Sequence, residues 1–112
     1  MLLKLEPQLQ ARLGISLKEI AQFCQRWNII ELALFGSVLS DQFHADSDID
    51  LLIRFESNAR QGLLTLAKIK HELEASIGRE VDIVLKESVE NSENWIRRNE
   101  ILKKAQVIYE QR

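Results

Sequence analysis

Hydrophobic side chains recur at helical spacing in two stretches of the chain. The first stripe predicts an amphipathic helix over residues 17–27, and a capping box at Ser16 and Glu19 marks its start. The second predicts a helix over residues 63–77, which Gly78 follows where a helix C-terminal glycine belongs. The stripes consist of Leu17, Ile20, Ala21, Cys24 and Trp27, and of Leu63, Leu66, Ile69, Leu73 and Ile77.

Compact apolar runs between these helices predict strands. They cover residues 29–35, 49–55 and 80–86, and a short closing strand over 106–110 follows a final helix over 92–105. The leucine-rich start, residues 2–13, predicts a short helix that Gly14 ends. This order predicts an α/β (α+β) fold, in which a small mixed sheet carries helices on one face. We expect residues 1–112 to form a single domain.

Composition narrows the class of protein. Hydrophobic residues make up 46% of the chain and charged residues 29%, as in ordinary globular proteins. A net charge of -2 argues against strong direct binding of nucleic acid by bulk electrostatics. The single cysteine, Cys24, lies on an apolar stripe and predicts a buried structural thiol. Residues 1–6 already carry charge and no long apolar run follows them, so we expect neither a signal peptide nor a membrane span, and a cytoplasmic protein.

Three aspartates stand out against this apolar pattern. Asp48 and Asp50 are two residues apart at the head of a predicted strand, so both carboxylates leave on the same face. Asp82 lies opposite the aliphatic face of the later strand. If those strands are neighbours, the three acids converge and can hold two metal ions about 3.5–4 Å apart, the arrangement used for nucleotidyl transfer. Oxygen ligands of this kind suit Mg²⁺. The alternative is a solvated strand start and an isolated edge acid.

A second feature is Gly36-Ser37, at the exit of the first long strand. Glycine allows the backbone to approach a ligand closely, and the Ser37 hydroxyl and nearby amides can donate to phosphate oxygens. Such a pair alone indicates only a turn. It gains weight because Asp48 follows Ser37 after ten intervening residues.

Together these segments resemble the polymerase-β-like nucleotidyltransferase superfamily. More narrowly, the chain resembles the minimal nucleotidyltransferases (MNT), antitoxins that are paired with HEPN ribonuclease toxins. The resemblance covers nearly the whole chain. It rests on four stretches: Ala-Leu-Phe-Gly-Ser, Asp-Ser-Asp-Ile-Asp-Leu-Leu, Gly-Arg-Glu-Val-Asp-Ile-Val and Ile-Arg-Arg-Asn-Glu-Ile-Leu.

The resemblance implies a palm-like fold and a Mg²⁺-dependent enzyme that transfers AMP from ATP to a tyrosine hydroxyl of a HEPN toxin. It implies that Gly36 and Ser37 grip the β and γ phosphates and that Asp48 and Asp50 bind both magnesium ions. Asp82 then binds the catalytic metal and helps to draw the proton from the acceptor. Many relatives carry an Arg-Gly pair after Gly-Ser, which is absent here; Arg54 is one candidate replacement.

Other functions and residues stay open at this point. A non-enzymatic antitoxin that masks its toxin is the main alternative. Transfer to a small molecule, or templated polymerisation, normally needs more chain than this. Among aromatic and histidine residues, we expect Trp27 in the core, His44 and His71 in solvent, and Trp95 as an anchor for the last helix, with base stacking or partner binding beside Arg97 and Arg98 as its alternative role.

Overall fold

A five-stranded sheet forms the centre of the computed structural model, which describes residues 2–57 and 62–111. The strand order is β1-β5-β2-β3-β4. β3 and β4 are parallel and the other neighbours are antiparallel, so the sheet is mixed, as predicted. The strands are β1 (Leu2–Leu3), β2 (Ile29–Phe35), β3 (Ile49–Phe55), β4 (Val81–Leu85) and β5 (Gln106–Glu110).

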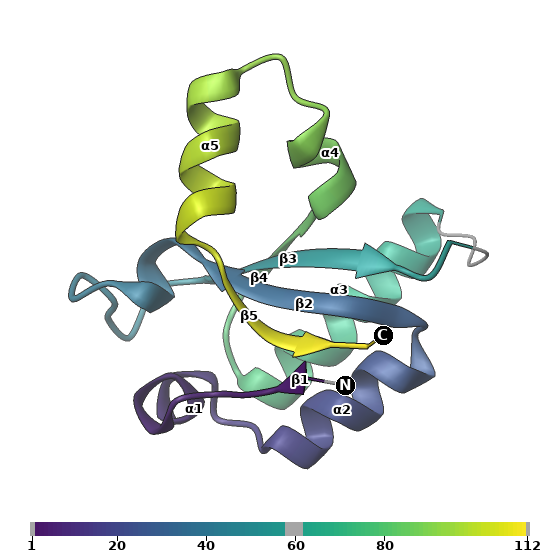
Figure 1. The fold of residues 1–112 in the computed structure, drawn as a ribbon. Helices are drawn as coiled ribbons and strands as arrows, with labels where there is room; N and C mark the ends of the chain where they lie inside the picture. The colour runs from purple at the N-terminus through teal and green to yellow at the C-terminus, as the bar shows by residue number, and fades with distance from the viewer. Residues whose placement is uncertain (1, 58–61, 112) are drawn as a thin grey trace.

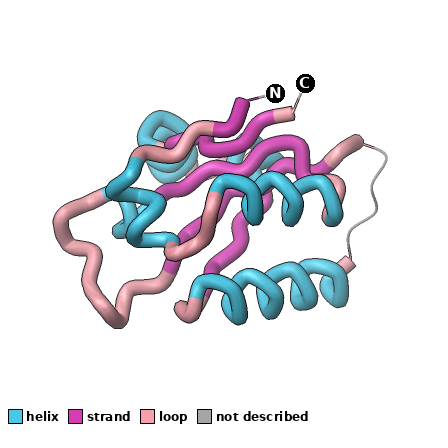
Figure 2. Tube along the Cα trace, turned by 90° about the horizontal axis from the view of Figure 1, so that it is seen from below, coloured by secondary structure: helices cyan, strands magenta, loops and turns pink. Residues whose placement is uncertain are grey.

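Three helices cover one face of this sheet (Figure 1). They are α1 (Pro7–Leu13), α2 (Leu17–Arg26) and α3 (Leu63–Ile77). Figure 2 shows α2 and α3 side by side beneath the strands, where Glu72 of α3 accepts hydrogen bonds from Arg26 and from the Trp27 indole. The large buried side chains between these layers include Ile20, Leu34, Ile49, Ile69 and Ile108. Hydrophobic burial on this side is therefore the main support of the sheet.

Local sequence signals explain where these helices begin and end. The Ser16 hydroxyl accepts from the Glu19 amide at 3.1 Å, and the Glu19 carboxylate accepts from the Ser16 amide, so the capping box is confirmed. Gly78 ends α3 in the left-handed conformation at φ 78°, which costs a glycine little. Gly14 ends α1 in the same way at φ 74°.

Two further helices, α4 (Lys86–Glu90) and α5 (Trp95–Lys104), lie on the opposite face (Figure 1). The sequence placed all helices on one face. The difference has a physical reason, since Ala33 and Leu52 point to the second face and are 1% exposed. Val89 of α4 and Ile101 of α5 cover them. Leu52 is two residues beyond Asp50, so α4 and α5 share the sheet face on which the acids lie.

Some predicted boundaries were wrong. Residues 2–13 do not form one helix, because Leu2 and Leu3 pair with β5 before α1 begins at Pro7. The third predicted strand ends at Leu85, and α4 follows at once. The last helix begins at Trp95 rather than at residue 92, since the Asn94 side chain accepts from the Arg97 amide and caps it. No helix in the described ranges combines the length and apolarity needed to cross a bilayer.

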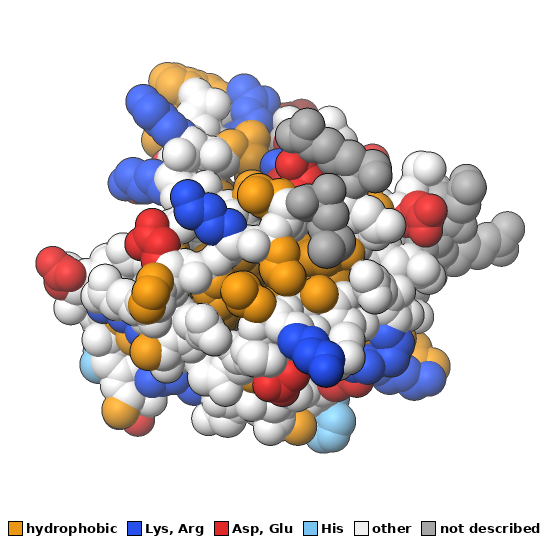
Figure 3. Space-filling model, turned by 60° about the horizontal axis from the view of Figure 1, so that its bottom comes forward, with side chains coloured by type: hydrophobic (Ala, Val, Ile, Leu, Met, Phe, Trp, Pro, Cys, Tyr) orange, Lys and Arg blue, Asp and Glu red, His pale blue; other side chains and the backbone are white. Residues whose placement is uncertain are grey.

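Figure 3 views the molecule with its underside turned forward. Hydrophobic side chains gather near the centre of this face, and charged side chains of both signs lie around them.

Candidate active site

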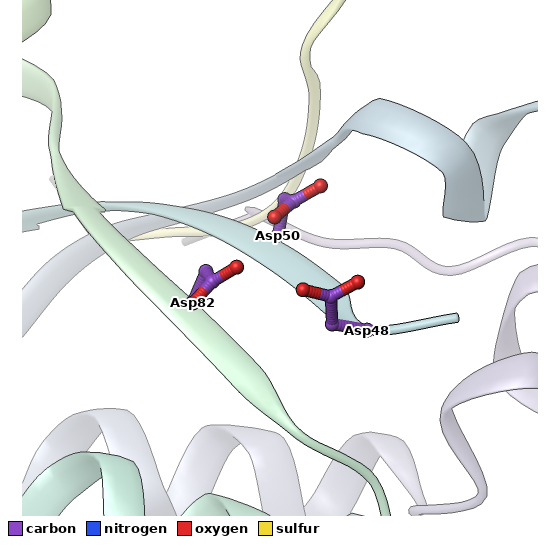
Figure 4. A group of neighbouring side chains, drawn as sticks. All are labelled: Asp48, Asp50 and Asp82. Carbon is purple, nitrogen blue, oxygen red and sulfur yellow. The ribbon is translucent and has the colours of Figure 1, made fainter. Parts of the chain in front are cut away.

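The three predicted aspartates lie together on the second face of the sheet (Figure 4). Asp50 of β3 and Asp82 of β4 are register partners in the parallel pair, so the ladder holds them side by side. Asp48 stands one residue before β3. Each offers a carboxylate oxygen within 4.8 Å of the others. The convergence expected from neighbouring strands is therefore present, and we call these residues the acidic triad.

The electrostatics of the acidic triad are unfavourable without a cation. Burial, then the charges of Asp48 and Asp82, raise the pKa of Asp50 to about 6. A hydrogen bond with Asp48, followed by burial and the Asp48 charge, raises the pKa of Asp82. Within the described ranges, no lysine or arginine forms an ion pair with a triad member.

This donor set fits a hard divalent ion. Carboxylate oxygens alone are the ligands that Mg²⁺ prefers, with water and phosphate oxygens completing its coordination. A cation among the three acids would relieve the repulsion that contributes to the raised pKa values of Asp50 and Asp82. Asp48 and Asp50 are half-buried and Asp82 is the most exposed of the three, so the site opens towards solvent and a ligand.

Gly36 and Ser37 lie beside the acidic triad because β2 and β3 are antiparallel neighbours. Phe35, the last residue of β2, is the register partner of Asp50. Gly36 has φ 79°, and a Cβ atom at that position would overlap the Asp50 carboxylate. Glycine is thus required here both for its backbone conformation and for the close approach. Gly36 also starts a short 3-10 turn, Gly36–Leu39, in which Ser37 is the second residue.

A groove of about 730 Å³ begins at Gly36 and Ser37. Its opposite wall comes from α5 and the start of β5, through Glu100, Ile101, Lys104 and Gln106. The volume lies in the range of small-molecule pockets. Sequence reasoning missed this wall, because the final helix was expected on the other face of the sheet.

The sequence profile of the nucleotidyltransferase domain family matches residues 17–108. The chain belongs to this family. The matched range includes the acidic triad and Gly36-Ser37, and the match confirms the predicted resemblance to the nucleotidyltransferases.

Individual relatives of this nucleotidyltransferase domain point to the minimal members of the family. A protein adenylyltransferase, MntA, from Thermococcus cleftensis is 34% identical over 67 residues, which are 60% of this chain and 66% of that protein. The match thus spans slightly less than two thirds of that relative's length. A structure described as that of a minimal nucleotidyltransferase is 32% identical, with a TM-score of 0.61 over 79% of this chain and 84% of the other.

A toxin–antitoxin structure with AMP-PNP superposes with a TM-score of 0.65 over 85% of this chain and 73% of the other. At 14% identity, that likeness shows the fold alone.

Other predicted residues have mixed outcomes in this nucleotidyltransferase domain. Arg54 lies on the same sheet face as the acidic triad. Its guanidinium forms ion pairs with Glu90 at 2.6 Å and with Glu31 at 3.8 Å, so these contacts occupy it and do not leave it as a replacement for the missing arginine. Trp95 is 60% exposed, so its expected role as an anchor was wrong. His44 and His71 are exposed, as predicted.

Proposed function

We propose that this chain is a Mg²⁺-dependent nucleotidyltransferase that moves AMP from ATP onto a tyrosine hydroxyl of a partner HEPN ribonuclease toxin. The product is a silenced toxin, so the chain acts as an antitoxin in the cytoplasm. The relative named protein adenylyltransferase and the fold shared with toxin–antitoxin structures support this choice of reaction and partner.

One observation carries the proposal: three carboxylates converge beside Gly36, and burial and the nearby acids raise the pKa values of Asp50 and Asp82. A structural role gives no reason to gather three like charges on one face. A role in holding divalent cations gives one, because bound metal lowers the cost of their proximity.

Each residue of the site has a separate role in the proposed reaction. The amides after Gly36 and the Ser37 hydroxyl donate to the β and γ phosphates of ATP. Asp48 and Asp50 would hold two metal ions, and Asp82 would help to hold the catalytic one. When bound, these ions neutralise the triphosphate and lower the pKa of the acceptor hydroxyl. The groove between Gly36 and Lys104 leaves room for the rest of the nucleotide.

The transfer itself is a displacement at the α-phosphorus. The acceptor oxygen forms a bond to that phosphorus while the bond to the β-phosphate oxygen breaks, and pyrophosphate leaves. Asp82 lies where it can help to take the acceptor proton, since it is the most exposed carboxylate of the acidic triad. Alignment of the acceptor is supplied by the partner, because the described part of this chain is little more than the sheet and its helices.

A second candidate is an antitoxin that masks its toxin without chemistry. Two observations favour it. The residues after Ser37 are Val38 and Leu39 rather than an arginine. Arg54, the candidate replacement, forms ion pairs with Glu90 and Glu31. Such a protein would need no triphosphate and no metal.

The test uses the purified chain with a purified candidate HEPN partner. Both are incubated with ATP labelled at the α-phosphate, with Mg²⁺ or with EDTA, and the toxin is weighed by intact mass spectrometry. We expect Mg²⁺-dependent addition of AMP and loss of ribonuclease activity.

Asp82→Asn and Asp46→Asn form a matched pair of variants for this assay. Both remove one negative charge, but Asp46 is an exposed loop residue outside the acidic triad. Transfer should disappear in the first variant and persist in the second. A toxin that is inhibited without any gain in mass would establish masking instead.

A further inference from the structure

The loop between Gly36-Ser37 and Asp48 is held by two arginines from outside it. The guanidinium Nη1 of Arg12, on α1, donates to the carbonyl oxygens of Val38 and Ser40 at 2.7 and 2.8 Å. Arg79 holds the other end of the same loop. Neither arginine has a role in the proposed reaction.

Arg79 gathers three carbonyl oxygens around one nitrogen. Its Nη1 donates to His44 at 2.9 Å and to Ala45 and Ser47 at 3.0 Å each. Three carbonyl dipoles that point to one place repel each other unless a cation stands there. The guanidinium carbon also lies 4.4 Å from the centre of the Phe43 ring, a distance typical of a cation–π contact.

The turn that Arg79 caps leads directly into the acidic triad. His44 and Ser47 already bond to each other: the Ser47 amide donates to the His44 carbonyl, and the His44 amide donates to the Ser47 hydroxyl, both at 3.0 Å. Asp48 is the next residue. The position of the Ser47 carbonyl therefore sets the direction in which the chain enters Asp48.

Asp48 needs such support more than its neighbours do. Asp50 and Asp82 are register partners in the β3–β4 ladder, which fixes their spacing. Asp48 lies one residue outside β3 and has no partner in that ladder. Arg79 stands three residues before Asp82, so one short segment carries one metal ligand and holds the turn that carries another.

We propose that Arg79 is a positioning residue, which sets the place of the Asp48 carboxylate relative to Asp50 and Asp82 and thereby the affinity of the acidic triad for a divalent cation. The inference rests on the metal site of the proposed function. It assigns to Arg79 a role that the β3–β4 ladder, which begins at Ile49, does not supply for Asp48.

The test is a titration with Mn²⁺, in which free Mn²⁺ is followed by electron paramagnetic resonance without nucleotide or toxin. Loss of an outer partner of a metal ligand typically weakens binding about 10–100-fold. We expect Arg79→Gln to raise the Mn²⁺ dissociation constant about 10-fold or more. Arg79→Lys keeps the charge but not the planar fork, so its effect should be smaller.

Arg12→Gln is the matched control. Arg12 also donates to loop carbonyls and lies 5.2 Å from the Phe43 ring, but its bonds are at the far end of the loop from Asp48. Its Mn²⁺ affinity should stay within about two-fold of the unsubstituted protein. In the transfer assay, Arg79→Gln should raise the Mg²⁺ concentration needed for half-maximal rate, with much of kcat recovered at saturating Mg²⁺.

The outcomes separate this inference from the proposed function. If the unsubstituted chain binds Mn²⁺ and a folded Arg79→Gln variant binds it equally well, the role of Arg79 is overturned and the metal site stands. If Arg79→Gln does not fold, as judged by circular dichroism, unchanged affinity in Arg79→Lys overturns it instead. Absence of Mn²⁺ binding by the unsubstituted chain would remove the metal site, and this inference with it.

Discussion

Replacing Asp50 with asparagine should make the metal-free protein more stable at neutral pH while abolishing transfer. Asparagine has nearly the shape of aspartate but no charge, and its amide can donate to the Asp82 carboxylate. The substitution therefore removes the repulsion within the acidic triad without leaving a cavity. A functional site that is strained in the absence of its ligand behaves in this way.

The magnitude follows from the pKa of Asp50. A rise from 3.8 to about 6 corresponds to about 3 kcal/mol between the two protonation states. Because the carboxylate is only half-buried, solvent screens part of this, and we expect a gain of about 1–2 kcal/mol at pH 7.5.

The direction of this pKa shift determines the pH range in which stability changes. Because the pKa of Asp50 is higher in the folded state than in the unfolded state, its contribution to folding is favourable at low pH and is lost as the pH rises from about 4 to 6.

The assay is urea unfolding in EDTA, followed by circular dichroism between pH 3.5 and 8. The gain of Asp50→Asn over the unsubstituted protein should be near zero at pH 3.5 and reach its plateau above pH 6. Asp46→Asn, which removes a charge from an exposed residue of the loop, should show no such gain.

Added Mg²⁺ should make the unsubstituted protein the more stable of the two, since a concentration of about one hundred times the dissociation constant stabilises it by about 2.7 kcal/mol. If Asp50→Asn were equally or less stable than the unsubstituted protein across the whole pH range in EDTA, charge repulsion would not destabilise the metal-free acidic triad.

Three further predictions concern other parts of the fold. Gly36→Ala should abolish transfer because its Cβ displaces the Asp50 carboxylate, whereas Gly14→Ala, also at positive φ but with open space around it, should cost about 1–2 kcal/mol in urea unfolding and leave transfer intact. Burial raises the pKa of the Cys24 thiol to about 12, so it should resist a disulfide reagent at pH 8 until the protein unfolds; rapid reaction of the folded protein would contradict its burial. Glu31→Gln should cost about 2 kcal/mol in the same unfolding assay, because buried Glu31 pairs with Lys86 and Arg54; an unchanged midpoint would show that the pairs contribute nothing.

The spacing of hydrophobic residues and the residues at helix ends made much of this fold predictable. The capping box at Ser16 and the glycine after α3 are local signals, and the structure has both where the sequence places them. Because successive side chains of a strand point to opposite faces of the sheet, the sequence alone placed Asp48 and Asp50 on one face. Asp82 required the further condition that β3 and β4 be neighbours, which is a non-local pairing that a single sequence leaves open.

The parts that were missed depend on contacts between distant segments. α5 was assigned to the wrong side of the sheet because its own stripe does not show which face of β2 and β3 lacks cover. Arg54 shares a face with the acids, yet Glu31 and Glu90, far away in sequence, hold it. Arg79 stood within a recognised motif, but its three carbonyl partners come from a loop more than thirty residues earlier.

Metal binding by the acidic triad can be observed by diffraction from crystals grown with Mn²⁺ and a non-hydrolysable ATP analogue, with data collected where manganese scatters anomalously. We expect anomalous density about 2–2.3 Å from carboxylate oxygens of Asp48, Asp50 and Asp82, with the triphosphate reaching Ser37. Nucleotide bound elsewhere, or density that leaves Asp82 without a metal contact, would contradict this expectation.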